Sequence, residues 1–191
     1  MSNELKNILN APAEVAASRL IGSDLIREVN GQKIIGRIVE TEAYDEADTA
    51  SHSYRGETAR TKIMFGQAGF LYVYFTYGMH YCCNIVTGPA GQGSAVLIRA
   101  LEPLLGIDLM TRNRKGRSIN ELTNGPAKLC EAMQIDKKLN GHNLTCSPLK
   151  LVVNPEVHSS QIVKTTRIGI SRAKDAELRF YLKANNFVSK T

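Results

Sequence analysis

Alternating apolar and polar side chains mark the first third of the chain as β structure. Residues 25–28 and 33–44 follow the period of two that sends successive strand side chains to opposite faces. Between them lies Asn30-Gly31, a dipeptide typical of two-residue hairpin turns. We therefore predict an antiparallel hairpin over these residues.

A second alternating stretch, residues 70–84 (FLYVYFTYGMHYCCN), contains four of the seven tyrosines. As a strand it carries Tyr72 and Tyr74 on one face and apolar side chains on the other. Gly78 permits a sharp reversal, so we predict a hairpin with Tyr77 and Met79 at its tip. The pattern also suits a sheet whose tyrosines pack in the core, whereas large side chains at an exposed tip favour insertion into a partner.

The remaining patterns predict helices among shorter strands. An Ala-rich helix over 12–21 has proline in its first turn and Gly22 as its stop. Residues 45–67 are a long polar stretch, and a loop of that length is typically functional or disordered. The other predicted elements are a flexible tail over 1–8, a turn over 88–93, helices over 103–114 and from Pro126 onward, and strands over 94–100, 149–153, 167–171 and 178–182.

These elements predict a single α+β domain over residues 1–191. It would have a mainly antiparallel β core, flanking helices and the tyrosine-rich hairpin protruding from it. A chain of 191 residues is an ordinary size for one domain and buries roughly 70% of the surface of its unfolded form. We see no internal repeat, low-complexity segment or linker that would divide it.

The charge balance favours a polyanionic partner. The formal net charge is +6, and residues 112–117 (RNRKGR) hold four cations without an acid. Such a run would follow a phosphate backbone, and it would equally suit a solvated loop. Charge alone therefore does not separate nucleic-acid binding from an ordinary basic surface.

The cysteines and histidines exclude several classes of site. The four cysteines form no C-x-x-C pair, and the four histidines show no ligand spacing, so we predict no metal site and no redox motif. The H-x-E and P-C-x-x-C signature of zinc deaminases is missing. With no signal peptide and no apolar run long enough to span a membrane, we expect reduced thiols in a cytoplasmic protein.

Candidate chemistry begins with the segment E-T-E-A-Y, whose alternation places Glu40, Glu42 and Tyr44 on one strand face. Two carboxylates about 7 Å apart disfavour joint ionisation when partly buried, which suits a general base. Periodicity leaves open which glutamate acts, and with Asp45 the acidic run would also suit a metal-dependent nuclease. Arg99 lies in a buried-type strand and needs a partner, for which Glu42 and Glu40 are the candidates.

Several motifs follow one another in order: R-I-V-E-T-E-A-Y (37–44), H-S (52–53), M-F (64–65), L-Y-V-Y-x-x-Y-G-M (71–79), C-x-N (82–84), V-L-I-R-A-L-E-P (96–103), G-P-A-K-L-C (125–130), T-R-I-G-I-S (166–171) and L-R-F-Y (178–181). Together they closely resemble the alkyladenine (3-methyladenine) DNA glycosylase family, in a bacterial-type member. The resemblance implies a fold similar to the C-terminal domain of methionyl-tRNA formyltransferases.

The resemblance implies catalytic roles for three residues. Glu42 matches the general base that activates a water to attack C1′ of a flipped nucleotide. Arg99 matches the arginine that helps to orient that water, and Ile168 falls where a main-chain carbonyl does so.

The resemblance also implies a base pocket. Tyr44 and Tyr74 match the aromatic rings that sandwich the base, and His52 matches a histidine that hydrogen-bonds it. Asn84 matches the asparagine that obstructs the 2-amino group of normal guanine. Tyr72 and Tyr81 match none of these roles and are expected to pack.

The DNA interface implied in this way centres on the hairpin tip. Tyr77 matches the tyrosine that intercalates into the stack, with Met79 beside it in the minor groove, and His80 stands where animal members have tyrosine. Four further residues fall near positions that line the DNA, namely Thr58, Arg60, Met64 and Lys128.

The implied activity is monofunctional excision of alkylated purines from double-stranded DNA by hydrolysis of the N-glycosidic bond. No lysine occupies a position suited to Schiff-base chemistry, so an abasic site would remain with the strand uncut. We expect a monomer that needs no cofactor. A catalytically silent nucleic-acid-binding module on the same scaffold is the alternative, although binding alone needs neither Glu42 nor Arg99.

Overall fold

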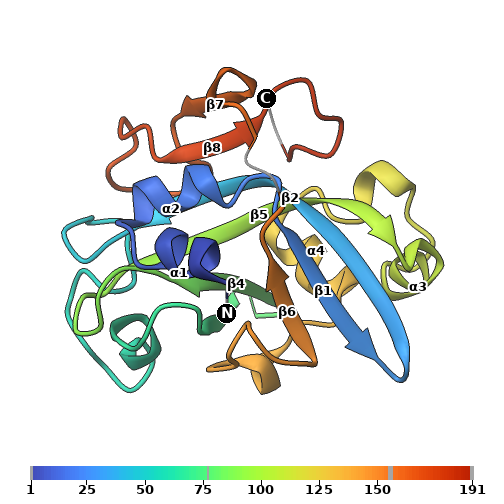
Figure 1. Ribbon diagram of the computed structural model, residues 1–191, viewed down its shortest axis with the longest axis horizontal. Coiled ribbons are helices and arrows are strands. Elements are labelled where there is room, and N and C mark those ends of the chain that lie inside the picture. Colours follow the sequence, from blue (N-terminus) through green and yellow to red (C-terminus); the bar gives the residue numbers. More distant parts are fainter. Residues whose placement is uncertain (1, 77, 155–156, 190–191) are drawn as a thin grey trace.

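The computed structural model describes residues 2–76, 78–154 and 157–189. Within these residues all strand pairs are antiparallel and join into one eight-stranded sheet in the order β3-β4-β5-β2-β1-β6, with β8 on β2 and β7 on β8 (Figure 1). The strands are β1 (Asp24–Val29), β2 (Gln32–Tyr44), β3 (Leu71–Thr76), β4 (His80–Val86), β5 (Ala95–Leu105), β6 (Leu149–Val152), β7 (Ile162–Thr165) and β8 (Arg179–Leu182). The predicted α+β class with an antiparallel core is confirmed.

Four short helices cover this sheet. They are α1 (Asn3–Leu9), α2 (Ala13–Arg19), α3 (Ile107–Asn113) and α4 (Pro126–Ala132). In Figure 1, α1 and α2 lie in front of the sheet and α4 lies behind it. Most of the buried side chains between these layers belong to one apolar cluster, which supports the sheet from both faces. No helix of the described residues is both long and apolar enough to cross a membrane.

Strand β2 is the central element of the functional region because it has partners on several sides. Its first half pairs with β1 through the predicted turn, where Asn30 and Gly31 have φ of +48° and +77°. Strand β5 pairs with β2 from Ile35 to Tyr44, and β8 pairs with it from Glu40 to Glu42. Irregular register beside Glu40 accompanies this exchange of partners.

The tyrosine-rich hairpin forms from β3 and β4 as predicted, with Tyr72 opposite Asn84. Its apolar face is shorter than the alternation indicates, because Leu71 and Val73 are buried whereas Phe75 is 53% exposed. Near the tip Met79 is 71% exposed, and Tyr77 lies outside the described residues.

The predicted flexible tail over residues 1–8 is wrong, since helix α1 occupies most of it. Leu5, Ile8 and Leu9 are spaced three and four residues apart, so they share one helix face and are buried. Ser2 caps the helix by accepting a hydrogen bond from the Leu5 N–H at 3.2 Å.

The helix predicted over 103–114 begins later than the sequence indicates. Strand β5 continues through Pro103 to Leu105, and Pro103 pairs with Gly36 beside an irregularity in the register. A proline is tolerated at such an irregularity because it has no N–H to donate. Helix α3 starts at Ile107, after Gly106 has turned the chain with φ of +76°.

The strand predicted over 167–171 is absent from the described structure. The chain there is irregular, with Gly169 at φ of +75°, and β7 lies earlier, at Ile162–Thr165. Arg167 and Ile168 donate hydrogen bonds to the carboxylates of Asp48 and Glu42, and Arg167 also donates to the Ala43 carbonyl of β2. This departure from strand geometry brings the segment to the functional region described next.

Candidate active site

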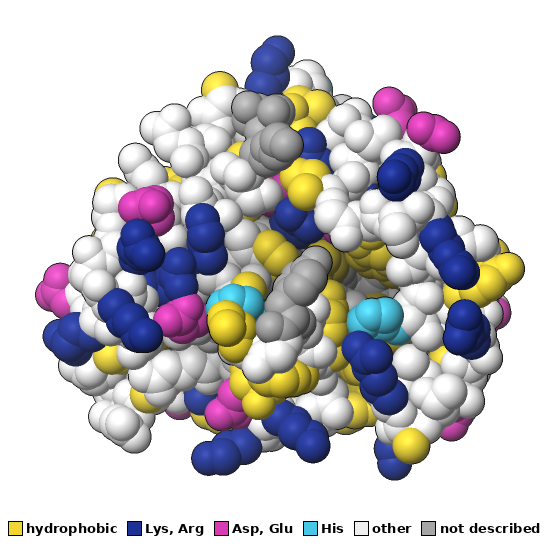
Figure 2. Space-filling model, turned by 180° about the vertical axis from the view of Figure 1, so that it is seen from behind, with side chains coloured by type: hydrophobic (Ala, Val, Ile, Leu, Met, Phe, Trp, Pro, Cys, Tyr) yellow, Lys and Arg dark blue, Asp and Glu magenta, His cyan; other side chains and the backbone are white. Residues whose placement is uncertain are grey.

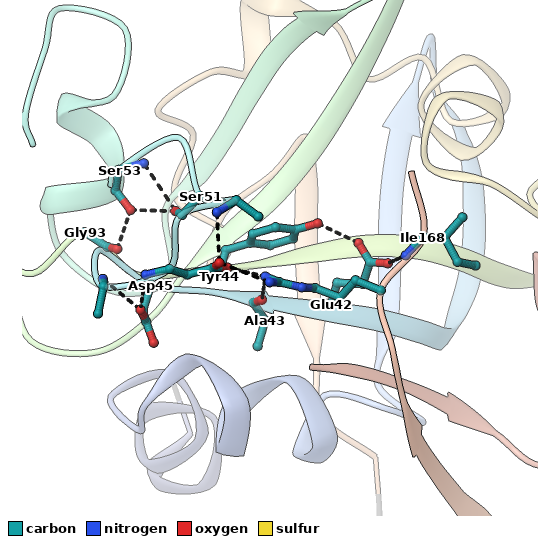
Figure 3. Close-up of polar contacts among 12 residues, drawn as sticks. Glu42, Ala43, Tyr44, Asp45, Ser51, Ser53, Gly93 and Ile168 are labelled. Atoms are coloured by element: carbon teal, nitrogen blue, oxygen red, sulfur yellow. Dashed lines mark hydrogen bonds and ion pairs between the residues drawn. The ribbon is translucent and has the colours of Figure 1, made fainter. Parts of the chain in front are cut away.

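Glu42 projects from the end of β2 into a cavity of about 560 Å³ and is fully buried. Its Oε1 accepts a hydrogen bond from the Ile168 N–H, and its Oε2 accepts one from the Tyr44 hydroxyl, both at 2.8 Å (Figure 3). Arg99 Nη1 lies 3.3 Å from Oε1. A carboxylate offers about four lone-pair positions, so these three contacts fix its orientation and leave capacity for a further donor.

Glu40, two residues earlier on the same strand, is also fully buried but does not line the cavity. Its Oε1 accepts from Arg179 Nη1 at 2.8 Å and lies 3.4 Å from Arg99 Nε. Its Oε2 accepts from the Ser189 N–H at 2.7 Å. Arg99 therefore bridges both glutamates that the sequence proposed as its partner, and of the two only Glu42 lines the cavity.

A second buried ion pair holds Tyr44. The Arg167 guanidinium lies over the Tyr44 ring with its central carbon 4.6 Å from the ring centroid. Both terminal nitrogens of Arg167 bond to the Asp48 carboxylate, and Nη1 also donates to the Ala43 carbonyl at 3.0 Å. Burial, and then the neighbouring Glu42 carboxylate, raises the pKa of the Tyr44 hydroxyl. The hydroxyl therefore stays protonated and available as a donor to Glu42.

His52 and Tyr74 form another wall of the cavity, and Tyr72 packs against both of them. The Tyr72 and Tyr74 rings stack with their centroids 5.6 Å apart, and the His52 ring meets Tyr74 edge-on at 4.6 Å. His52 Nδ1 lies 3.1 Å from the Tyr72 hydroxyl. Tyr72 is 1% exposed, which confirms that it packs, and it also orients His52.

His52 has a pKa lower than the usual value for an exposed histidine. As a whole residue it is solvent-exposed, yet its ring lies against two tyrosines. The loss of water around the ring, and then the charge of Arg60, lowers the pKa of His52 to about 4. The ring is therefore neutral near pH 7, with one nitrogen free to accept or donate according to the tautomer.

Asn84 and Cys82 complete the wall contributed by β4. Asn84 is 5% exposed, and its Oδ1 has no hydrogen-bond partner among the described residues. A buried amide oxygen without a partner costs free energy, which is commonly tolerated where a ligand contacts it. Burial raises the pKa of the Cys82 thiol to about 11, so this neighbour is a neutral thiol.

The residues expected to line DNA are spread more widely. Met79 is exposed near the hairpin tip, but Met64 is 1% exposed and belongs to the cavity wall. The Thr58 hydroxyl is bonded to that of Thr61 at 2.9 Å, and the Arg60 guanidinium lies 5.9 Å from the Tyr74 ring centroid. On α4, Lys128 Nζ donates to Asn124 Oδ1 at 2.8 Å. Tyr77 lies outside the described residues.

The face seen in Figure 2 combines hydrophobic and basic side chains. Yellow hydrophobic side chains occupy its middle, and dark-blue Lys and Arg side chains lie on both sides of them. Of the cations in residues 112–117, Arg114 forms an ion pair with Glu131. The basic run predicted from sequence is therefore partly committed to the protein's own structure.

The acidic run does not form a metal-ion cluster in the described residues. No group of three or more His, Cys, Asp or Glu side chains there is placed to hold a metal ion. Glu40 and Glu42 instead contact arginines and main-chain N–H groups. The nuclease interpretation of these carboxylates therefore gains no support from the geometry.

Comparison with known proteins identifies the family. The model of the family described as methylpurine-DNA glycosylase matches residues 7–186. A protein of Carboxydothermus hydrogenoformans is 54% identical over 177 residues, which cover 92% of this chain and 93% of the relative. A protein of Francisella tularensis subsp. tularensis is 49% identical over 191 residues, covering 98% and 99%. Each bears the name "Putative 3-methyladenine DNA glycosylase". The chain belongs to the methylpurine-DNA glycosylase family.

Sequence reasoning missed the residues that hold the site residues in place. Arg167 and Arg179 were not singled out, although Arg167 contacts Tyr44 and Arg179 contacts Glu40. Asp48 was considered only as part of the acidic run, whereas it pairs with Arg167. The one available signal was that Arg167 directly precedes Ile168. Its pairing with Asp48 spans 119 positions of the chain, so only the fold could disclose it.

Proposed function

We propose that this protein is a monofunctional DNA glycosylase of base excision repair that removes alkylated purines from duplex DNA. The proposed substrates are 3-methyladenine and 7-methylguanine, with hypoxanthine and ethenoadenine as neutral extensions. Membership of the methylpurine-DNA glycosylase family and the names of the relatives support this class. We also propose that its scaffold is similar to the C-terminal domain of formyltransferases.

One observation carries the proposal: a buried carboxylate with spare acceptor capacity faces an aromatic cavity. The Ile168 N–H and the Tyr44 hydroxyl fix Glu42, and Arg99 places positive charge beside it. A water bonded to Glu42 would then be held in one orientation, which is what general-base catalysis requires. Arg99 and the Ile168 carbonyl are proposed to share in orienting this water.

The reaction follows from that arrangement. The water oxygen forms a bond to C1′ of the flipped nucleotide, and Glu42 takes the water proton. The bond between C1′ and the purine nitrogen breaks, and its electron pair leaves with the base. For 3-methyladenine that electron pair neutralises the positive charge of the alkylated ring. Such bases leave readily, whereas neutral lesions need an added proton on the leaving group.

Base recognition is assigned to the aromatic walls. Tyr44 and Tyr74 would enclose the flipped base, and a cationic purine is attracted to the π faces of such rings. Neutral His52 would hydrogen-bond the base without adding positive charge. The unpartnered Asn84 amide is proposed to obstruct the 2-amino group of guanine.

The DNA contacts are proposed from the hairpin and its surroundings. Exposed Met79 would enter the minor groove beside Tyr77, since apolar wedges at that position offset the cost of flipping. Arg60, Thr58 and Lys128 would contact the strands around the cavity. Met64, being buried in the cavity wall, is now proposed to contact the flipped nucleotide rather than the duplex.

The decisive experiment measures release from duplexes that each carry one defined lesion. Wild type should leave abasic sites that become strand breaks only after alkali, with activity undiminished by EDTA. Glu42→Gln should slow release by about 10²–10⁴-fold while retaining binding to damaged duplex. The exposed-site control Glu57→Gln should behave as wild type. Breaks before alkali would indicate a lyase or nuclease. Undiminished release by Glu42→Gln, or binding by wild type without release, would contradict the proposal.

A further inference from the structure

A second cavity, of about 620 Å³, runs along the outer edge of β3. Unlike the Glu42 cavity, it is lined by no carboxylate of the described residues. Strand β3 is the last strand of its end of the sheet, and the segment after η3 (Lys137–Leu139) covers only part of its edge. Asn140, which lines this cavity, accepts a hydrogen bond through its Oδ1 from the Val73 N–H at 2.9 Å. We call this second cavity the edge groove.

Aromatic rings dominate the walls of the edge groove. Phe75 is 53% exposed, and its ring lies 5.2 Å from that of Tyr81. Tyr72 and Tyr74 close the other side, so Tyr74 borders both the groove and the Glu42 cavity. Phe75 therefore presents a solvent-facing aromatic surface beside the ring of Tyr81.

The charges of the groove have one sign. Arg60 and Lys137 line it, and no carboxylate does. In residues 2–76, 78–154 and 157–189, neither cation forms an ion pair with an acidic side chain. The Arg60 guanidinium lies 5.9 Å from the centroid of the Tyr74 ring. Both cations are exposed and free to meet an anion.

We propose that the edge groove binds an unpaired nucleotide of single-stranded DNA, with its base on Phe75 and Tyr81 and its phosphate between Arg60 and Lys137. Proteins bind single-stranded nucleic acids through aromatic surfaces that stack on the bases and through nearby cations that contact the phosphates. Duplex DNA does not suit the groove, because the faces of its bases are covered by their neighbours. This inference rests on the proposed function, which supplies DNA as the partner.

A protein with this groove would hold a damaged base close to a single-stranded segment of the same DNA. Because Tyr74 borders both cavities, a nucleotide in the groove lies next to the strand whose damaged base occupies the Glu42 cavity. Lesions beside gaps or flaps should therefore be bound more tightly than the same lesions in continuous duplex.

The test uses a short, undamaged, fluorescein-labelled oligothymidylate and measures anisotropy over a range of salt concentrations. Phe75→Ala should weaken binding about 5- to 100-fold, as expected for the loss of one stacked base. Lys137→Ala should lower the salt slope by about 0.7, the value for one phosphate contact on a single strand. The neighbouring Lys138 is equally exposed but does not line the groove, so Lys138→Ala should leave both quantities unchanged.

Several outcomes would overturn the assignment. The first is that Lys137→Ala and Lys138→Ala change oligothymidylate binding equally. The second is that Tyr44→Ala loses this binding while Phe75→Ala retains it. The third is that polyglutamate binds as tightly as oligothymidylate. Leu105→Ala, which removes another exposed apolar side chain, controls for general loss of surface apolar contact. Release of alkylated purines from blunt duplex is measured on the same proteins. If wild type releases alkylated purines but the groove variants bind oligothymidylate as wild type does, this inference is wrong and the proposed function is unaffected.

Discussion

Glu40 and Glu42 share one strand face and one arginine, yet their surroundings differ. Every contact of Glu40 runs into the protein, to Arg179, Arg99 and the Ser189 N–H. Glu42 has its contacts on one side and the cavity on the other. Two chemically identical side chains thus have different surroundings, since protein contacts enclose one and the other borders the cavity.

The difference shows how a buried carboxylate remains available for reaction. A charge buried without partners costs several kcal/mol, so both glutamates need cations and donors. Glu40 forms an ion pair with Arg99 and so helps to hold the guanidinium beside Glu42. The first glutamate stabilises the arrangement in which the second is left with an open acceptor position.

The largest expected effect breaks the reactive side of this comparison. Glu42→Gln should slow single-turnover base release by about 10²–10⁴-fold, the usual contribution of a positioned general base. The amide keeps the shape of the side chain, so the melting temperature should change far less than in Glu40→Gln. Equal destabilisation of the two variants would contradict the division of roles.

The next effect concerns the supporting side. Glu40→Gln leaves the facing Arg99 and Arg179 without their shared carboxylate and should lower the free energy of unfolding by about 3–5 kcal/mol. Urea unfolding measures this, with Glu57→Gln as an exposed control. A variant as stable as wild type would show that Glu40 is dispensable for holding Arg99.

A smaller effect tests the ion pair behind Tyr44. Arg167→Lys keeps the charge but loses the paired hydrogen bonds to Asp48 and the flat contact with the tyrosine ring, at a cost of about 1.5–3 kcal/mol. Base release should slow as well, because Tyr44 and Ile168 both orient Glu42. Lys174→Arg, an exposed exchange of the same two residue types near by, should have no effect on either quantity.

The smallest effect is a pH dependence at His52. Its pKa of about 4 lies below the usual 6.5, so the unfolded chain binds more protons at this residue between those values. The stability contribution is fully present above pH 6.5 and is lost as the pH falls toward 4. Excision of cationic 3-methyladenine should weaken over the lower part of this range, because a protonated His52 repels it. NMR titration of the His52 ring checks the midpoint, and a value near 6.5 would refute the prediction.

Much of the fold was readable because it depends on local pattern. Alternation and the Asn30-Gly31 turn predicted β1 and β2, and Pro126 marked the start of α4. The failures came where tertiary contacts outweighed local signals. Helix α1 was read as a tail because only three buried side chains stabilise it, and the 167–171 segment was read as a strand although acidic partners far away in sequence hold it.

The sequence by itself determined the family, the shared strand face of Glu40, Glu42 and Tyr44, and the need of Arg99 for a carboxylate. These depend on residue order and on a period of two, which need no distant contact. Only the tertiary structure decided that Arg99 bridges both glutamates, that Glu42 faces the cavity and that Arg167 stands behind Tyr44. Those facts depend on which distant segments β2 meets, because burial and open space are properties of the assembled sheet.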